Sequence, residues 1–69
     1  MTPPKNNLKN LRIDNDMTQV EVAELLGLSR LTYRRYENGE HEIPAGILIT
    51  LADYYKVTID YLLGRESPK

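Results

Sequence analysis

The sequence predicts one compact, all-α domain built from five short helices. At 69 residues the chain has room for a single domain. Its apolar residues recur every three to four positions, and no segment shows the two-residue alternation of a half-buried strand. Thr, Ser, Pro and Gly stand at the breaks between these segments, where helices begin and end. We therefore expect a fold made of helices alone.

Composition excludes several classes of protein. The chain has no Cys and one His, so we expect no disulfide, no metal site and no cofactor. No apolar run approaches a membrane span of ~18–20 residues, and the N-terminus lacks the apolar stretch of a signal peptide, so we expect a cytoplasmic protein. The length excludes a large enzyme, and no catalytic motif or enclosed small-molecule pocket is expected in so small a chain. The chain is expected not to be an enzyme.

The first helix is expected at residues 7–15, where Leu8 and Leu11 have helical spacing. Residues 1–6 contain Pro3-Pro4, which is extended and cannot join a helix interior. We expect them to form a flexible N-terminal arm.

The second helix is expected at residues 19–26. Thr18 and Glu21 have the spacing of a capping box, in which the hydroxyl and the carboxylate each accept a hydrogen bond from the other residue's backbone N–H. Gly27 stands where a helix commonly ends in the left-handed conformation, and Ser29 can cap another helix. Such a short connection predicts a helix-turn-helix, two helices that cross steeply.

The last two helices are expected at residues 44–55 and 59–63. Pro44 suits a first helical position, Thr58 suits an N-cap, and Gly64 suits a helix end. These boundaries give a helix-turn-helix domain over residues 7–64 and a C-terminal tail over residues 65–69.

The third helix, expected at residues 30–38, has two unlike sides. Successive residues of a helix are rotated by ~100°. One side of this helix therefore carries Tyr33, Tyr36 and Glu37. The other side carries Leu31, Arg35 and Asn38, with Arg34 on its flank. Arg30 opposes the helix dipole, and Leu31 leaves an apolar side chain in water, which together suggest a partner surface. Double-stranded DNA offers one, because arginine bonds guanine and leucine packs on a thymine methyl. The alternative is that the arginines form only a solvated face.

Charge is unevenly distributed along the chain. The net charge is −1, but residues 1–36 carry six basic and four acidic side chains, whereas residues 37–69 carry three basic and six acidic ones. The densest positive charge lies between Arg30 and Arg35. A strongly basic, nonspecific nucleic-acid coat protein is therefore not indicated.

Five motifs, LKNLR, TQVEVAELLGLS, YRRYENG, EIP and LADYYKVTIDYLLG, follow one another between residues 8 and 64. In this order and spacing they resemble the phage repressor and Cro-like (XRE-type) helix-turn-helix family. The resemblance implies a lambda-repressor-like domain that binds operator DNA as a homodimer, with its second helix across the DNA backbone and its third helix in the major groove.

The resemblance also implies roles for individual residues. It assigns base reading to Arg30, Leu31, Thr32 and Arg35, and contacts with the DNA backbone to Gln19, Arg34 and Asn38. Arg12 and Glu37 match a buried ion pair between the first and third helices, and Ala23 and Gly27 match small residues that let two helices cross closely. Ile59, Tyr61, Leu62 and the tail are candidates for the dimer surface by position only.

Two departures from the family qualify this transfer. The segment Glu40-His41-Glu42 is acidic where many relatives are basic, which should weaken binding to the DNA backbone. Tyr33 occupies a core position that is commonly Ile or Val, so its hydroxyl needs water or a partner.

The expected function is a sequence-specific transcriptional regulator, a repressor that binds a palindromic operator. The alternative is a protein-interaction module of the same fold, such as an antitoxin. Relatives often continue beyond LLG, so the chain is either a stand-alone regulator or an isolated domain.

Overall fold

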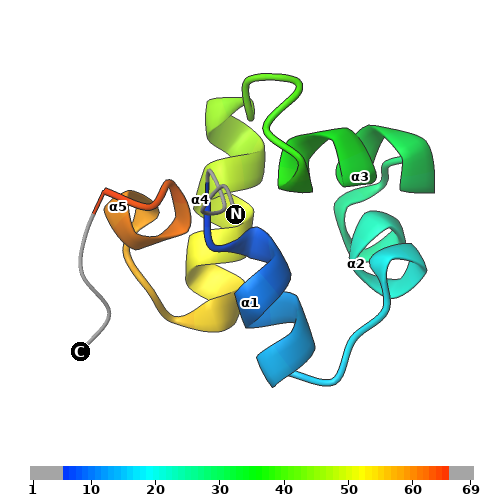
Figure 1. The fold of residues 1–69 in the computed structure, drawn as a ribbon. Helices are drawn as coiled ribbons and strands as arrows, with labels where there is room; N and C mark the ends of the chain where they lie inside the picture. Colours follow the sequence, from blue (N-terminus) through cyan, green and yellow to red (C-terminus); the bar gives the residue numbers. More distant parts are fainter. Residues whose placement is uncertain (1–5, 66–69) are drawn as a thin grey trace, which may run out of the picture.

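The computed structural model describes residues 6–65, and this part of the chain folds into five α-helices without any strand. The helices are α1 (Leu8–Asp14), α2 (Gln19–Leu26), α3 (Arg30–Glu37), α4 (Ala45–Tyr55) and α5 (Ile59–Leu62). Figure 1 shows α2 and α3 together on one side of the molecule, α1 and α4 in the middle, and α5 on the opposite side. The prediction of an all-α, five-helix fold is confirmed. In residues 6–65 no helix is long and apolar enough to cross a membrane.

Hydroxyl side chains begin three of the helices, as their sequence positions predict. Each accepts a hydrogen bond from the backbone N–H three residues further on: Thr18 from Glu21, Ser29 from Thr32, and Thr58 from Tyr61. The Thr18 backbone N–H also donates to the Glu21 carboxylate at 2.8 Å, which completes the capping box. Pro44 was expected inside its helix, but its ψ of 149° is extended, so it is the N-cap and α4 begins at Ala45.

All five helices end in the same way. A residue with positive φ follows each helix, namely Asp16, Gly27, Gly39, Lys56 and Gly64. The backbone N–H of the next residue then donates to the carbonyl five positions earlier, for example Leu28 to Ala23 at 2.8 Å and Glu40 to Arg35 at 2.9 Å. This is the Schellman arrangement, which satisfies carbonyl groups that the helix leaves unpaired. It fixes the direction in which the chain leaves each helix.

Gly27 has a different role from the one the family resemblance implied. A Cβ built on Gly27 would meet no atom within 4 Å, so close packing of helices does not require glycine here. Its backbone conformation favours glycine instead, because its φ of 71° lies in the left-handed region, which is costly for residues with a side chain. Ala23, in contrast, is buried and belongs to the core.

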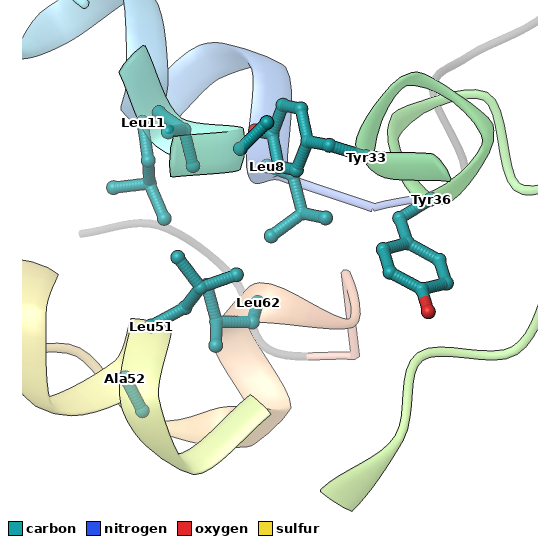
Figure 2. Close-up of a cluster of buried hydrophobic side chains, with 9 residues drawn as sticks. Leu8, Leu11, Tyr33, Tyr36, Leu51, Ala52 and Leu62 are labelled. Carbon is teal, nitrogen blue, oxygen red and sulfur yellow. The ribbon is translucent and has the colours of Figure 1, made fainter. Parts of the chain in front are cut away.

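The core draws side chains from all five helices. Its buried members are Leu8, Leu11, Val22, Ala23, Tyr33, Tyr36, Leu51, Ala52 and Leu62. In Figure 2 the Tyr33 ring reaches from α3 toward α1, and Leu51 lies beside Leu62. Because Leu62 is fully buried within this core, it cannot contribute to a dimer surface; this corrects its place among the candidates. Ile59, in the same helix, is 37% exposed.

The start of the described chain is packed, which corrects one predicted boundary. Asn6 was expected in a flexible arm, but it is buried, and its Nδ2 donates to the carbonyl of Tyr36 at 2.9 Å. The side-chain amide of Asn7 donates to the carbonyl of Tyr61, and its backbone N–H donates to the carbonyl of Leu62. These asparagines satisfy carbonyl groups at the ends of α3 and α5, so the packed domain includes Asn6.

The end of the packed domain also differs slightly from the prediction. Arg65 was assigned to the tail, but its backbone N–H donates to the carbonyl of Asp60 at 2.9 Å as part of the last helix end. The remainder of the expected arm, residues 1–5, and of the expected tail, residues 66–69, lies outside the described residues.

Candidate nucleic-acid interface

The two sides of α3 lie as the helical periodicity predicts. Tyr33, Tyr36 and Glu37 are buried against the rest of the domain. The opposite side carries the sequence-predicted DNA contacts: Arg30, Leu31, Arg34, Arg35 and Asn38 are exposed, and Thr32 is half-buried. The structure therefore places the predicted base-reading residues together on one accessible side of a single helix.

This exposed side is positively charged and has not been neutralised by the protein. Within residues 6–65 the only ion pair joins Arg12 to Glu37, so Arg30, Arg34 and Arg35 form none with the described acidic residues. Between these cations, Leu31 is 49% exposed. An apolar side chain among unpaired guanidinium groups fits an anionic partner that also offers apolar contacts, as a DNA major groove does.

A hydrogen-bonded network around Glu37 holds α3 in place. Arg12 Nε donates to Glu37 Oε2 at 2.6 Å, and Arg12 Nη2 donates to Oε1 at 3.3 Å, so the pair is bidentate. Gln19 Nε2 also donates to Glu37 Oε1, at 3.1 Å. The side chains of Arg12 and Glu37 are only 12% and 3% exposed. The network therefore joins α1 and the start of α2 to the inward side of α3 in water-poor surroundings.

The network determines the charge of Glu37. Burial acts to raise the pKa of this carboxyl, but Arg12, the nearby Tyr33 hydroxyl and Gln19 together outweigh it, and the pKa lies below its ordinary value. Glu37 is therefore ionised near neutral pH, as a bidentate partner of a guanidinium must be. The pair supports the structure and is not exposed to a ligand.

Two tyrosine hydroxyls are buried without a hydrogen-bond partner at bonding distance, on Tyr33 and Tyr55. Burial, followed by the nearby Glu37 carboxylate, raises the pKa of Tyr33. Burial also raises the pKa of Tyr55 to about 12. Both phenols are therefore neutral at physiological pH. The sequence analysis expected the Tyr33 hydroxyl to reach water or a partner; among residues 6–65 it is buried, and no partner lies at bonding distance.

Gln19 stands at the first position of α2, and its side chain reaches Glu37 on α3. Only one of the two amide hydrogens is needed for the bond to Glu37, so the other remains able to donate. The first backbone N–H groups of α2 have no partner within the helix, and the positive end of the helix dipole lies there. This end of α2 therefore has the donors that a phosphate requires.

The segment after α3 brings acidic side chains to the candidate interface. Asn38 Nδ2 donates to Glu40 Oε2 at 3.2 Å, and both side chains are exposed. An open hollow of about 300 Å³ lies nearby, lined by Thr32, Arg35, Tyr36, His41 and Glu42. Two predicted base-reading residues, Thr32 and Arg35, thus share this hollow with the acidic segment.

The sequence analysis missed the specific contacts of this segment. It recognised the acidic charge but did not place Glu40 against Asn38 or His41 beside Arg35. The signal was present, because a glycine at a helix end fixes the position of the residue that follows it, here Glu40. No group of three or more His, Cys, Asp or Glu among residues 6–65 could hold a metal ion.

Comparison with known proteins gives the family. A helix-turn-helix family model matches residues 8–62. The HTH-type transcriptional regulator YqaE of Bacillus subtilis is 39% identical over 61 residues, which cover 88% of this chain and 53% of the regulator. The cryptic phage CTXphi transcriptional repressor RstR of Vibrio cholerae is 36% identical over 61 residues, with 88% and 54% covered.

A relative with a different kind of name is the antitoxin PezA of Streptococcus pneumoniae, which is 32% identical over 61 residues. The match covers 88% of this chain and 39% of the antitoxin. The chain thus spans about half the length of the regulators and less of the antitoxin. The family match, over residues 8–62, contains α1 to α5. The chain belongs to the phage repressor-like, XRE-type helix-turn-helix family.

Proposed function

We propose that the chain is a sequence-specific, double-stranded DNA-binding transcriptional regulator, and that it represses by occupying a palindromic operator as a homodimer. The observation that carries the proposal is the exposed side of α3, where three unpaired arginines surround an exposed leucine. The regulator and repressor names of YqaE and RstR support a role in transcriptional regulation. Such a function places the chain in the cytoplasm and requires no enzyme activity.

The proposed contacts divide into two classes. Arg30, Leu31, Thr32 and Arg35 read base edges in the major groove, because they share the accessible side of α3. Gln19, Arg34 and Asn38 contact phosphates, because they lie at the start of α2, on the flank of α3 and at its end. The base contacts give sequence preference, whereas the phosphate contacts give affinity for any duplex.

The proposal is tested by selecting bound duplexes from a random DNA pool with the purified chain. A dimer is expected to recover a palindrome with half-sites about one helical turn, ~10 base pairs, apart. Arg35→Ala should cost ~1–3 kcal/mol of binding and relax the preference at one position in each half-site, whereas Asn38→Ala should weaken all duplexes about equally. Unchanged base preferences in Arg35→Ala would show that the reading side is assigned incorrectly.

The second candidate is a protein-interaction module, which the match to antitoxin PezA and the acidic segment after α3 favour. Ionic strength separates the two functions. Affinity for DNA falls steeply as salt rises because counterions are released from the phosphates. An apolar protein interface responds weakly to salt. Recovery of no DNA motif even at low salt would favour the protein partner.

A further inference from the structure

The amide of Asn38 is already engaged in the DNA-free chain. Its Nδ2 donates to Glu40 Oε2 at 3.2 Å, and both residues are exposed. Under the proposed function the same amide donates to a phosphate oxygen of the DNA. The carboxylate of Glu40 and a DNA phosphate therefore compete for the same amide group, because anions bound to its two hydrogens lie close together and repel each other.

The position of Glu40 is fixed by the end of α3. Gly39 adopts a φ of 74°, and the backbone N–H of Glu40 donates to the carbonyl of Arg35 at 2.9 Å. The backbone of Glu40 is thus held to the last turn of α3, one residue beyond the left-handed glycine. Its carboxylate starts from a fixed point next to Asn38, so the helix end brings the contact within reach of the two side chains, whose rotamers then form it.

Among the described residues no positive side chain pairs with the carboxylate of Glu40, so its negative charge can repel an incoming phosphate. No lysine, arginine or histidine of residues 6–65 forms an ion pair with it. A second carboxylate, that of Glu42, lines the hollow beside Arg35. The segment after α3 thus presents negative charge to the surface that the proposed function assigns to DNA.

We propose that Glu40 is an intramolecular competitor of DNA, which holds the Asn38 amide until a phosphate displaces it. The inference rests on the proposed function, and it adds a residue that sets affinity without touching a base. A phosphate bound to the other amide hydrogen lies beside the carboxylate, so repulsion between the two anions favours opening of the Asn38 to Glu40 bond. Because the competition involves only the backbone of DNA, it lowers affinity for cognate and random duplexes alike.

The test compares Glu40→Gln with Asp53→Asn, which removes the same charge from an exposed position on α4. Dissociation constants are measured for a random duplex and for the selected operator, at low and at high salt. Glu40→Gln should bind both duplexes about three- to tenfold more tightly at low salt, because one like charge near a phosphate is removed and a neutral amide is a weaker acceptor. The gain should shrink at high salt, and Asp53→Asn should change affinity less than about twofold.

A double-mutant cycle with Asn38→Ala shows whether Glu40 acts through the amide. In that background Glu40→Gln should gain clearly less affinity than in the wild type, because only the removal of a like charge near the phosphate still contributes. An equal gain with and without Asn38, or equal effects of Glu40→Gln and Asp53→Asn, would overturn the competition. If the wild-type chain binds no duplex at low salt, the proposed function itself fails. Unfolding curves of each variant exclude a change of fold, which these exposed positions are not expected to cause.

Discussion

On its inward side, α3 has its charge fully paired, whereas on its outward side three charges are unpaired. Glu37 accepts hydrogen bonds from both Arg12 and Gln19 and is buried. Arg34 and Arg35, within one turn of Glu37, and Arg30, about two turns away, form no ion pair with residues 6–65. One eight-residue helix therefore combines a side that folding satisfies with a side that folding leaves for a partner. Substitutions on the two sides should be measured in different experiments.

The largest effect is expected from Glu37→Ala. Removing the carboxylate leaves the guanidinium of Arg12 mostly buried without its anion, which costs ~3–5 kcal/mol for such pairs. Since a domain of this size has a similar total stability, the variant should be largely unfolded at room temperature. Circular dichroism and urea titration measure this. A stable Glu37→Ala domain would show that the ion pair contributes little to the free energy of unfolding. The two sides of α3 would then not differ in their importance for folding.

The pair also predicts a pH dependence of stability. The pKa of Glu37 is below its ordinary value of 4.5, so its contribution to the free energy of unfolding is fully present above 4.5. It is lost progressively as pH falls below 4.5 and through the lower pKa of the folded state. Urea titrations between pH 7 and pH 3 should show this loss in the wild type and a smaller loss in Glu37→Gln. An equal loss of unfolding free energy with falling pH in the wild type and in Glu37→Gln would contradict the prediction.

The outward side should give the opposite pattern. Arg35→Ala, which we expect to weaken DNA binding, should change the free energy of unfolding by no more than about 0.5 kcal/mol, because its exposed side chain has no ion-pair partner among the described residues. Thermal unfolding of the variant and of the wild type measures this change in stability. Destabilisation by more than about 1 kcal/mol would mean that Arg35 supports the fold, and its effect on DNA binding would no longer identify a contact.

The sequence predicts the inward side of α3 better than the surroundings of the outward side. Local rules are sufficient for the helices, because caps, left-handed glycines and apolar spacing act within a few residues. The Arg12 to Glu37 pair came from the family resemblance. The contacts of Asn6 with α3 and of Glu40 with Asn38 were not predicted. The first joins residues 30 positions apart, which no local rule reaches, and the second depends on the rotamers of two exposed side chains.

Two helix ends, at Asp16 and Lys56, show another limit of local rules, because residues other than glycine adopt a positive φ there. Lys56 adopts a φ of 59° at the end of α4, where glycine would be unstrained. Lys56→Gly should stabilise the domain by about 0.5–1 kcal/mol, the relief of the left-handed strain less the added freedom of the unfolded chain. Lys56→Ala, which removes the charge but keeps a Cβ, is the control. Equal stability of the two variants would exclude backbone strain as the cause.

No loss of stability is expected from Tyr33→Phe, which tests whether the inward side of α3 is satisfied throughout. The Tyr33 hydroxyl is buried without a hydrogen-bond partner, although it faces the Glu37 network. Removing an unpaired buried hydroxyl removes its desolvation penalty and leaves the ring in place, so stability should stay the same or rise by up to about 1 kcal/mol. Tyr36→Phe, on the same side of α3, serves as the control, and urea titration compares them. A loss of more than about 1 kcal/mol in Tyr33→Phe would show that the hydroxyl is bonded in solution, with a bridging water to Glu37 as the simplest arrangement. The inward side would then be satisfied at every polar group, and its contrast with the unpaired arginines would be complete.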